Sequence, residues 1–327
     1  MRAARCEKYG TPDVVSVQTV PEPVAGPGHV LVDVAAAAVN YPDVLFIADK
    51  YQVSMPLPYI PGGEFAGTVR AIGSGVSGLR VGDRVMGSAK SGGAFAERIA
   101  VPADVLTPVP AGLAMVEAAA FPVVYTTAYH ALVTVGRVQR GDWVVVLGAA
   151  GGVGTATVDI ATRLGARVIA CASSSQRLQV AKSMGAAEGI AYGSEDLKDR
   201  IKQITGGGAT LVIDPVGGGY SEQALRALAP GGVFVTVGFA AGEIPRIPLN
   251  LVLLKDITIR GLELRTLPAR HPEAVAAAGV ALAELVGKGM KPHVSRVYPL
   301  ERVVEALERV AGQESTGKVV VAIDPAV

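Results

Sequence analysis

The sequence predicts an α/β protein whose middle part forms a parallel sheet covered by helices on both faces. Between Trp143 and Gly261, short apolar runs alternate with segments of helical periodicity, which is typical of βαβ units. Ahead of Trp143, the chain consists instead of short apolar runs separated by glycine and proline. That pattern favours a small, barrel-like β domain.

Length and composition support two domains and exclude several classes of protein. The chain has 327 residues, half of them hydrophobic, which is more than one ordinary core accommodates. A net charge of +1 with no basic patch argues against nucleic-acid binding. Two cysteines without ligand spacing fit a reducing compartment. With neither a signal-like N-terminus nor an apolar run of about 20 residues, we expect a cytoplasmic protein outside the membrane.

The elements follow from these patterns in chain order. In the first third, strands are predicted at 30–37, 67–72 and 84–86. The middle is predicted to hold strands at 144–147, 167–172, 189–192, 210–214, 233–237 and 257–261, with helices at 153–164, 176–184, 197–204 and 221–228. The tail is predicted to hold helices at 273–286 and 301–310 and a last strand at 317–323. This strand comes too late to extend the βαβ series, so we expect it to return to the first domain.

A glycine-rich loop joins the first strand of the βαβ series to its helix. It contains Ala149, Gly151, Gly152, Val153 and Gly154, with alanine in the place of the first glycine of a dinucleotide fingerprint. Gly151 is expected to let the backbone approach a pyrophosphate, and Gly154 to let the helix pack closely on the strand. The positive end of the helix dipole favours the phosphate charge. The alternative is a glycine-rich turn without a ligand.

The end of the second βαβ strand indicates which dinucleotide is bound. A site for NAD needs a carboxylate there to bind the ribose 2′-hydroxyl. This strand ends instead with Ser173 and Ser174, followed by Arg177, and has no acid. Hydroxyls and a guanidinium suit a 2′-phosphate, so we expect NADPH. One serine is also expected to cap the following helix.

Several stretches together resemble one known family over nearly the whole chain. They are 38–43 (AVNYPD), Tyr51, 61–67 (PGGEFAG), 81–85 (VGDRV) and the glycine loop 148–154. These stretches resemble the zinc-independent medium-chain dehydrogenases/reductases, closest to the zeta-crystallin-like NADPH:quinone oxidoreductases. The resemblance implies a mostly β, GroES-like catalytic domain from residues 1–123 and 265–327, with a Rossmann domain, residues 124–264, inserted between its two parts.

The resemblance also assigns roles to individual residues. Substrate and nicotinamide contacts are implied for three residues, Asn40, Asp43 and Tyr51. Further cofactor contacts are implied for Tyr41, Thr127, Ser173, Ser174, Arg177, Tyr192, Val216, Gly217, Gly238, Phe239 and Lys318. Each of three residues also has a plainer interpretation: Tyr51 as a packing aromatic near Pro56 and Pro58, Asp43 as a local cap, and Lys318 as an exposed side chain.

The zinc-dependent relatives differ at two positions. They have a cysteine where this chain has Asn40, and a histidine where it has Gly63 before Glu64. A catalytic zinc needs about three ligands of the Cys, His or carboxylate kind, and only Glu64 remains. The four-cysteine structural zinc loop is absent, and the four histidines lack ligand spacing. We therefore expect no metal.

Without a Lewis acid to stabilise an alkoxide, alcohol oxidation is disfavoured. We expect NADPH-dependent reduction of a small quinone, with a 2-enoyl-thioester or enone reductase as the alternative. A nucleotide-binding structural protein of the crystallin type is a more distant alternative. Single-stranded RNA binding lacks the aromatic platform that it needs. Finally, residues 256–262 are expected to form the edge strand of the parallel sheet, with Ile257, Ile259 and Leu262 on its apolar side, and to pair across a homodimer.

Overall fold

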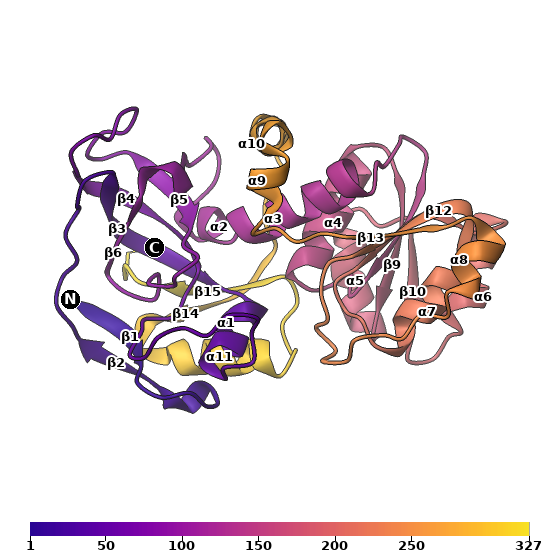
Figure 1. Cartoon of the computed structure of the whole chain (residues 1–327), viewed down its shortest axis with the longest axis horizontal. Coiled ribbons are helices and arrows are strands. Elements are labelled where there is room, and N and C mark those ends of the chain that lie inside the picture. The colour runs from indigo at the N-terminus through magenta and orange to yellow at the C-terminus, as the bar shows by residue number, and fades with distance from the viewer. Residues whose placement is uncertain (327) are drawn as a thin grey trace. The chain divides into compact units, whose positions relative to one another are not determined.

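The computed structural model of the protein describes residues 1–326. Two compact units make up the chain: unit 1 contains Met1–Val123 and Lys291–Val327, and unit 2 contains Val124–Met290. Figure 1 shows the indigo and yellow segments, from the two ends of the chain, together in unit 1.

Unit 2 is built on a six-stranded sheet in which every neighbouring pair is parallel. Its strands are β8 (Trp143–Leu147), β9 (Arg167–Ala172), β10 (Glu188–Ala191), β11 (Ala209–Asp214), β12 (Leu228–Thr236) and β13 (Thr258–Gly261). Their spatial order, β10-β9-β8-β11-β12-β13, is that of a doubly wound dinucleotide-binding sheet. The predicted Rossmann sheet is thus confirmed. The order reverses between β8 and β11, where such sheets bind ligands at the carboxyl ends of their strands.

One α-helix and a π-helix come before β8, and a helix follows each of the six strands. They are α3 (Pro122–Tyr129), the π-helix η3 (His130–Val135), α4 (Gly152–Arg163), α5 (Ser175–Ser183), α6 (Leu197–Thr205), α7 (Gly219–Arg226), α8 (Asn250–Lys255), α9 (Leu267–Arg270) and α10 (Pro272–Gly287). Helix α3 starts in unit 1 and continues into unit 2. Within residues 1–326, every helix is too short or too polar to cross a lipid bilayer.

One domain boundary differs from the prediction. Residues 265–290, expected in the second part of the catalytic domain, belong to unit 2. The reason is side-chain chemistry that a hydropathy pattern does not reveal. Arg163 at the end of α4 donates hydrogen bonds to the carbonyl oxygens of Lys288 (3.2 Å) and Gly289 (3.3 Å), just after α10. Because these bonds hold α10 on the parallel-sheet unit, the catalytic unit resumes only at Lys291.

Unit 1 contains a seven-stranded sheet of order β14-β15-β3-β4-β5-β7, with β6 paired to β3. All its pairs are antiparallel except β14 with β15. The strands are β3 (His29–Val39), β4 (Glu64–Ile72), β5 (Arg84–Ser88), β6 (Arg98–Pro102), β7 (Leu106–Pro108), β14 (Val294–Pro299) and β15 (Lys318–Ala322). A separate hairpin pairs β1 (Arg2–Cys6) with β2 (Val15–Thr19). The last strand does return to the first domain, where β15 pairs with β3.

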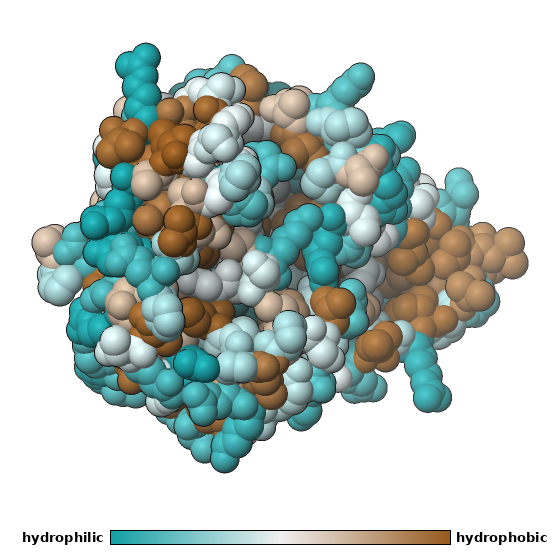
Figure 2. All heavy atoms as spheres, turned by 60° about the vertical axis from the view of Figure 1, so that its left-hand side comes forward, coloured by the Kyte–Doolittle hydropathy of each residue, from teal (hydrophilic) through white to brown (hydrophobic). Residues whose placement is uncertain are grey.

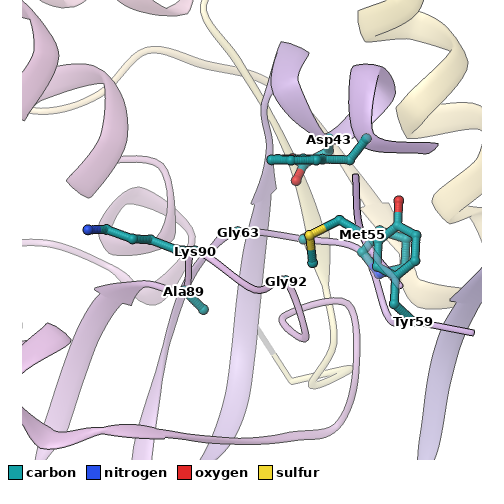
Figure 3. A pocket seen from close by; sticks show the side chains of 10 residues that line it. Asp43, Met55, Tyr59, Gly63, Ala89, Lys90 and Gly92 are labelled. Carbon is teal, nitrogen blue, oxygen red and sulfur yellow. The ribbon is translucent and has the colours of Figure 1, made fainter. Parts of the chain in front are cut away.

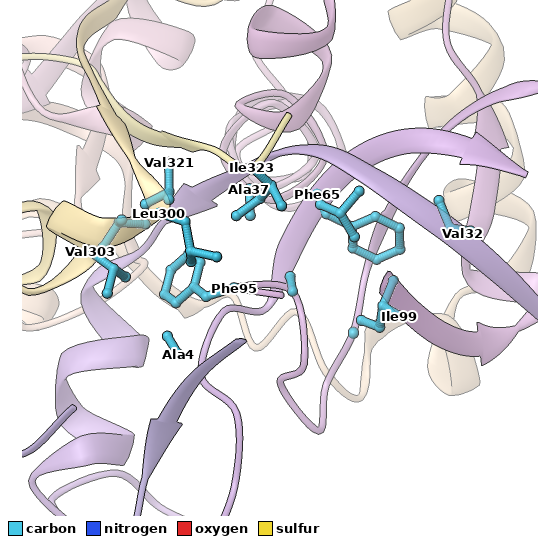
Figure 4. Close-up of a cluster of buried hydrophobic side chains, with 14 of the residues drawn as sticks. Ala4, Val32, Ala37, Phe65, Phe95, Ile99, Leu300, Val303, Val321 and Ile323 are labelled. Atoms are coloured by element: carbon cyan, nitrogen blue, oxygen red, sulfur yellow. The ribbon is translucent and has the colours of Figure 1, made fainter. Parts of the chain in front are cut away.

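Short helices complete unit 1: α1 (Tyr41–Ile47), α2 (Met115–Ala119), α11 (Val303–Ala311) and single 3-10 turns at Pro12–Val14, Ala103–Val105 and Leu300–Arg302. The core of this unit mixes both ends of the chain, as Figure 4 shows around Phe65 and Phe95. Val321 and Leu300 pack with these early residues. Since burying each such side chain stabilises the fold by roughly 1.5–3 kcal/mol, the two chain segments depend on one another.

Strand β13 forms one edge of the parallel sheet, as predicted, but its faces differ from the prediction. Ile257 and Leu262 are buried, whereas Ile259 is 39% exposed, because an edge strand is covered on only part of its surface. Leu253 and Leu254 of the neighbouring α8 are also exposed. Apolar side chains gather at the right-hand end of the space-filling view, over unit 2 (Figure 2).

Candidate functional site

The glycine loop of unit 2 lies between the end of β8 and the start of α4. Gly148 has a φ of +58°, a left-handed conformation that favours glycine. A Cβ on Gly154 would lie 2.1 Å from the carbonyl oxygen of Gly148 and 2.7 Å from the Cα of Ala149, so no side chain fits. Gly151, the N-cap of α4, has only ordinary contacts around the same position. Its lack of a side chain is therefore not required by the protein's own packing, which agrees with the predicted approach to a ligand.

Asp214, which sequence reasoning missed, arranges the next two loops at this edge of the sheet. Its Oδ1 accepts hydrogen bonds from the backbone N–H groups of Val216 (2.8 Å) and Gly217 (2.9 Å). Its Oδ2 accepts from the hydroxyl of Ser221 at 2.6 Å, and its carbonyl oxygen accepts from Gly238 N–H at 3.3 Å. An acid that ends an apolar strand was the available signal. Asp214 thus holds both loops: its buried carboxylate binds the loop that contains Val216 and Gly217, and its backbone carbonyl oxygen binds the loop that contains Gly238.

These loops meet the glycine loop at the reversal of the strand order. A Cβ on Gly148 would lie 2.7 Å from Cγ2 of Val216, and one on Gly217 would lie 2.9 Å from the ring of Phe239. Phe239 itself is partly exposed. The carboxyl ends of β8, β11 and β12 therefore bring together most of the predicted cofactor residues of unit 2.

The predicted 2′-phosphate residues lie at the end of β9 and the start of α5. Ser174 is the N-cap of α5 and accepts the backbone N–H of Arg177 at 3.4 Å, whereas Ser173 is exposed. Tyr192 stacks on Tyr220, with ring centroids 4.1 Å apart. Burial is the main cause that raises the pKa of Tyr192 to about 12, and the positive charge of Arg177 opposes the rise.

In unit 1, a buried ion pair occupies the region predicted for substrate contacts. The ammonium group of Lys318 donates to Glu64 Oε2 at 2.9 Å, to Asn40 Oδ1 at 2.7 Å and to the carbonyl oxygen of Val39 at 3.1 Å. Lys318 is 3% exposed and Glu64 is 0% exposed, so the interpretation of Lys318 as an exposed side chain is wrong. Three acceptors use all three N–H groups of the ammonium. Lys318 therefore holds the protein's own groups in place and has no donor left for a cofactor in this arrangement.

Glu64 has both carboxylate oxygens engaged. Oε1 accepts the backbone N–H of Val123 at 2.6 Å, in the first turn of α3. Oε2 accepts from Lys318 and, at 2.9 Å, from Nδ2 of Asn40. The second N–H of the Asn40 amide makes only a long contact, 3.4 Å, with the carbonyl oxygen of Ala38. Glu64 and Lys318 together fix the orientation of the Asn40 amide.

Asp43 lies beside this cluster on α1 and is 5% exposed. Its Oδ2 accepts the backbone N–H of Asn40 at 2.7 Å, so the local capping role is present. Burial raises the pKa of Asp43 to about 7; Glu64 adds to the rise, while Lys318 and the hydrogen bond from Asn40 oppose it. The carboxyl group lines a pocket of about 20 Å³, room for one water molecule (Figure 3). Other lining residues include Met55, Gly63 and Lys90.

The remaining predicted residues lie near these groups but outside the cluster. Tyr51 packs on Phe46, which lines the same pocket, with ring centroids 4.5 Å apart. Tyr51 therefore packs on Phe46, and its packing near Pro56 and Pro58 stays a prediction. Tyr41 is half-buried at the first position of α1, and Thr127 is buried on α3.

The donor set at Glu64 does not suit a catalytic metal. Asn40 and Gly63 stand at the positions of the other ligands, and the Glu64 oxygens are taken by Lys318, Asn40 and Val123. Throughout the described part of the chain, no three His, Cys, Asp or Glu side chains are grouped as a metal site would require.

A doubly wound sheet with a dinucleotide loop, together with a β unit made from both ends of the chain, defines a two-domain oxidoreductase. Two family models match: "Alcohol dehydrogenase GroES-like domain" over residues 26–111 and "Zinc-binding dehydrogenase" over residues 152–279. The chain belongs to the medium-chain dehydrogenase/reductase superfamily, in its zeta-crystallin-like family.

Individual relatives are similar to this chain over nearly its whole length. A "Quinone oxidoreductase-like protein 2 homolog" from Nematostella vectensis is 37% identical over 98% of this chain and 88% of its own length. The quinone oxidoreductase of Thermus thermophilus, solved alone and with NADPH, is 33% identical with a TM-score of 0.86, over 99% of this chain and 100% of its own. A structure described as an NAD-dependent alcohol dehydrogenase is 31% identical with a TM-score of 0.91, at the same coverage.

Proposed function

We propose that this protein is an NADPH-dependent oxidoreductase that reduces quinones by hydride transfer without zinc. The observation that carries the zinc-free mechanism is the Lys318–Glu64 ion pair. In this pair a resident ammonium neutralises the one ligand-type residue that the zinc-dependent relatives share. A bound nicotinamide would supply the hydride, and the protein would orient the acceptor and exclude water.

The choice of NADPH rests on the end of β9. Ser173 is exposed there, Arg177 lies in the first turn of α5, and no carboxylate follows the strand. A guanidinium binds phosphate with paired, charge-assisted hydrogen bonds, whereas a ribose hydroxyl needs an acid. The Thermus relative was solved with NADPH.

Replacing Arg177 with alanine tests this choice. NADPH should bind roughly 10- to 100-fold more weakly, because a charge-assisted contact worth about 1.5–3 kcal/mol is lost. NADH affinity should scarcely change, and both are measured by fluorescence titration. Lys182→Ala is the matched control, since it removes an exposed positive charge from the same helix, α5. A wild-type preference for NADH would contradict the assignment.

The chemical class of the acceptor is proposed from the side chains of unit 1. Alcohol oxidation is disfavoured without a Lewis acid to stabilise the alkoxide, and Glu64 is not free to bind one. Quinones and alkenes conjugated to a carbonyl need less acid help. The long contact of Asn40 Nδ2 with Ala38 is the donor most easily redirected to an acceptor oxygen, and Tyr51 is a second candidate donor.

Oxidation of NADPH, followed in parallel with quinones, enones and enoyl-CoAs, tests the activity. Quinones should give the highest kcat/KM. A preference for enoyl-CoA or enones would favour the reductase alternative on the same scaffold. Tight NADPH binding with turnover no faster than the uncatalysed rate would favour a structural protein.

Metal removal gives an independent test. Activity should survive exhaustive chelation, because the cation beside Glu64 is the covalently attached Lys318. Elemental analysis should find no stoichiometric zinc, with a zinc-dependent alcohol dehydrogenase treated alongside as the control. One tightly held zinc per chain would overturn the proposed mechanism.

We also infer a homodimer through the free edge of β13. Leu262 N–H bonds to Thr236 in β12, and strand alternation therefore turns the N–H groups of Ile259 and Gly261 to the open side. Ile259→Pro removes one outward donor without touching the β12 ladder, and should shift the protein toward monomer in sedimentation at micromolar concentration. Ile259→Val keeps the donor and should stay dimeric. A monomeric wild type would refute the inference.

A further inference from the structure

The chain passes between the two units twice, at Val123/Val124 and at Met290/Lys291. Within unit 2, one hydrogen-bonded network holds the residues next to both passages. Tyr125 lies just after the first passage, and Lys288 and Gly289 lie just before the second. These residues are far apart in sequence, so their common anchor is a property of the fold.

The anchor consists of Asp159 and Arg163 on α4. Asp159 accepts the Tyr125 hydroxyl at 3.1 Å through Oδ2 and the Nε of Arg163 at 2.6 Å through Oδ1. The other two nitrogens of the same guanidinium donate to the carbonyl oxygens of Lys288 and Gly289. Those carbonyl groups belong to the C-terminal end of α10, where helices leave acceptors unsatisfied.

Because its members are buried, this network favours one arrangement of the chain at both passages. Tyr125 is almost fully buried and Asp159 is 5% exposed. Burial raises the pKa of Asp159, while Arg163 and Tyr125 oppose the rise. A buried carboxylate that loses either partner is left under-satisfied, so the network favours a single arrangement of both passages.

Helix α4 also begins at the glycine loop, so its first turn is the predicted pyrophosphate site, and its C-terminal half carries the two side chains that bond residues next to the passages. On the unit 1 side, the first passage is held by Glu64 through Val123 N–H, and the second by the ion pair of Lys291 with Glu117 at 3.4 Å. Both passages are thus held on each side.

We propose that Asp159 and Arg163 are positioning residues: they tie both inter-unit passages to the cofactor helix and so support the transfer step rather than cofactor binding. This inference rests on the proposed function, in which a bound nicotinamide passes a hydride to an acceptor. Hydride transfer depends on close alignment of the two, and a misplacement of about 1 Å costs roughly 100-fold in rate.

The test compares Arg163→Met with Arg167→Met. Arg167 is the matched control because it also bonds a backbone carbonyl, that of Gly141 at 3.1 Å, and lies over the Trp143 ring, and neither contact involves a residue next to a passage in the sequence. For Arg163→Met we expect an NADPH Kd within about twofold of wild type and a kcat lower by roughly 10- to 100-fold. Arg167→Met should leave both unchanged. Equal losses in affinity and kcat, or no loss in kcat, would overturn the proposal.

Amide hydrogen exchange provides a readout that does not depend on activity. Arg163→Met should speed exchange both at 286–291 and at 122–129, because the first passage is held through Asp159. Faster exchange at 286–291 alone would mean that Arg163 only caps α10. It would refute the proposal that α4 links both passages. If none of the tested acceptors supports NADPH oxidation by the wild type, the proposed function fails. The exchange pattern still tests by itself whether α4 links the two passages.

Discussion

Replacing Lys318 with methionine is expected to lower the free energy of unfolding by roughly 3–5 kcal/mol. The change leaves the carboxylate of Glu64 fully buried without its cation, and Asn40 and Val39 lose a donor. Removal of one partner of a buried pair costs far more than the pair contributes net, because a charge remains in a medium that solvates it poorly. Urea denaturation followed by circular dichroism measures the loss.

The double variant Glu64→Gln with Lys318→Met is the control. Glutamine keeps an acceptor for the backbone N–H of Val123 but carries no charge, so most of the lost stability should return. A loss below about 1 kcal/mol in Lys318→Met alone would mean that water reaches Glu64, against the burial described above.

Gly154→Ala is expected to weaken NADPH binding on the order of 100-fold, equivalent to about 3 kcal/mol. The added methyl group would lie 2.1 Å from the carbonyl oxygen of Gly148, so the first turn of α4 must move away from β8. That movement displaces the backbone N–H groups that are proposed to bind the pyrophosphate.

Gly279→Ala serves as the control for this substitution. Gly279 lies within α10, where a Cβ meets nothing within 4 Å, so alanine should leave NADPH affinity unchanged and stabilise the helix by up to about 1 kcal/mol. Isothermal titration of both variants measures the difference. Unchanged NADPH affinity in Gly154→Ala would separate the glycine loop from cofactor binding.

The parallel sheet and its glycine loop were predictable because their signals are local. Each strand is a short apolar run followed by a turn, and Gly154 lies at the strand-to-helix junction where the fingerprint requires it. The return of the last strand was also predictable, because that strand comes too late to extend the βαβ series, and the pairing of β15 with β3 confirms it.

The contacts that shape the site were not predictable in the same way. Glu64 and Lys318 are 254 positions apart, and nothing near either residue indicates the other. Composition favours an exposed lysine, since an unpaired one is almost never fully buried. Similarly, the periodicity of α10 gives its apolar face but not the unit that covers it, which depends on the side chain of Arg163.

The position of β15 has a consequence for synthesis of the protein. This strand lies inside the sheet of unit 1, between β14 and β3, and pairs with residues 36–39 of β3. Lys318 follows Val39 by 279 positions, roughly 15–55 seconds of translation at about 5–20 residues per second. The alanine-rich end of β3 therefore has no β15 to pair with, and stays an exposed apolar edge, while the ribosome synthesises all of unit 2. A nascent chain that stalls after Met290 should carry a folded dinucleotide domain and an aggregation-prone, unfinished catalytic domain.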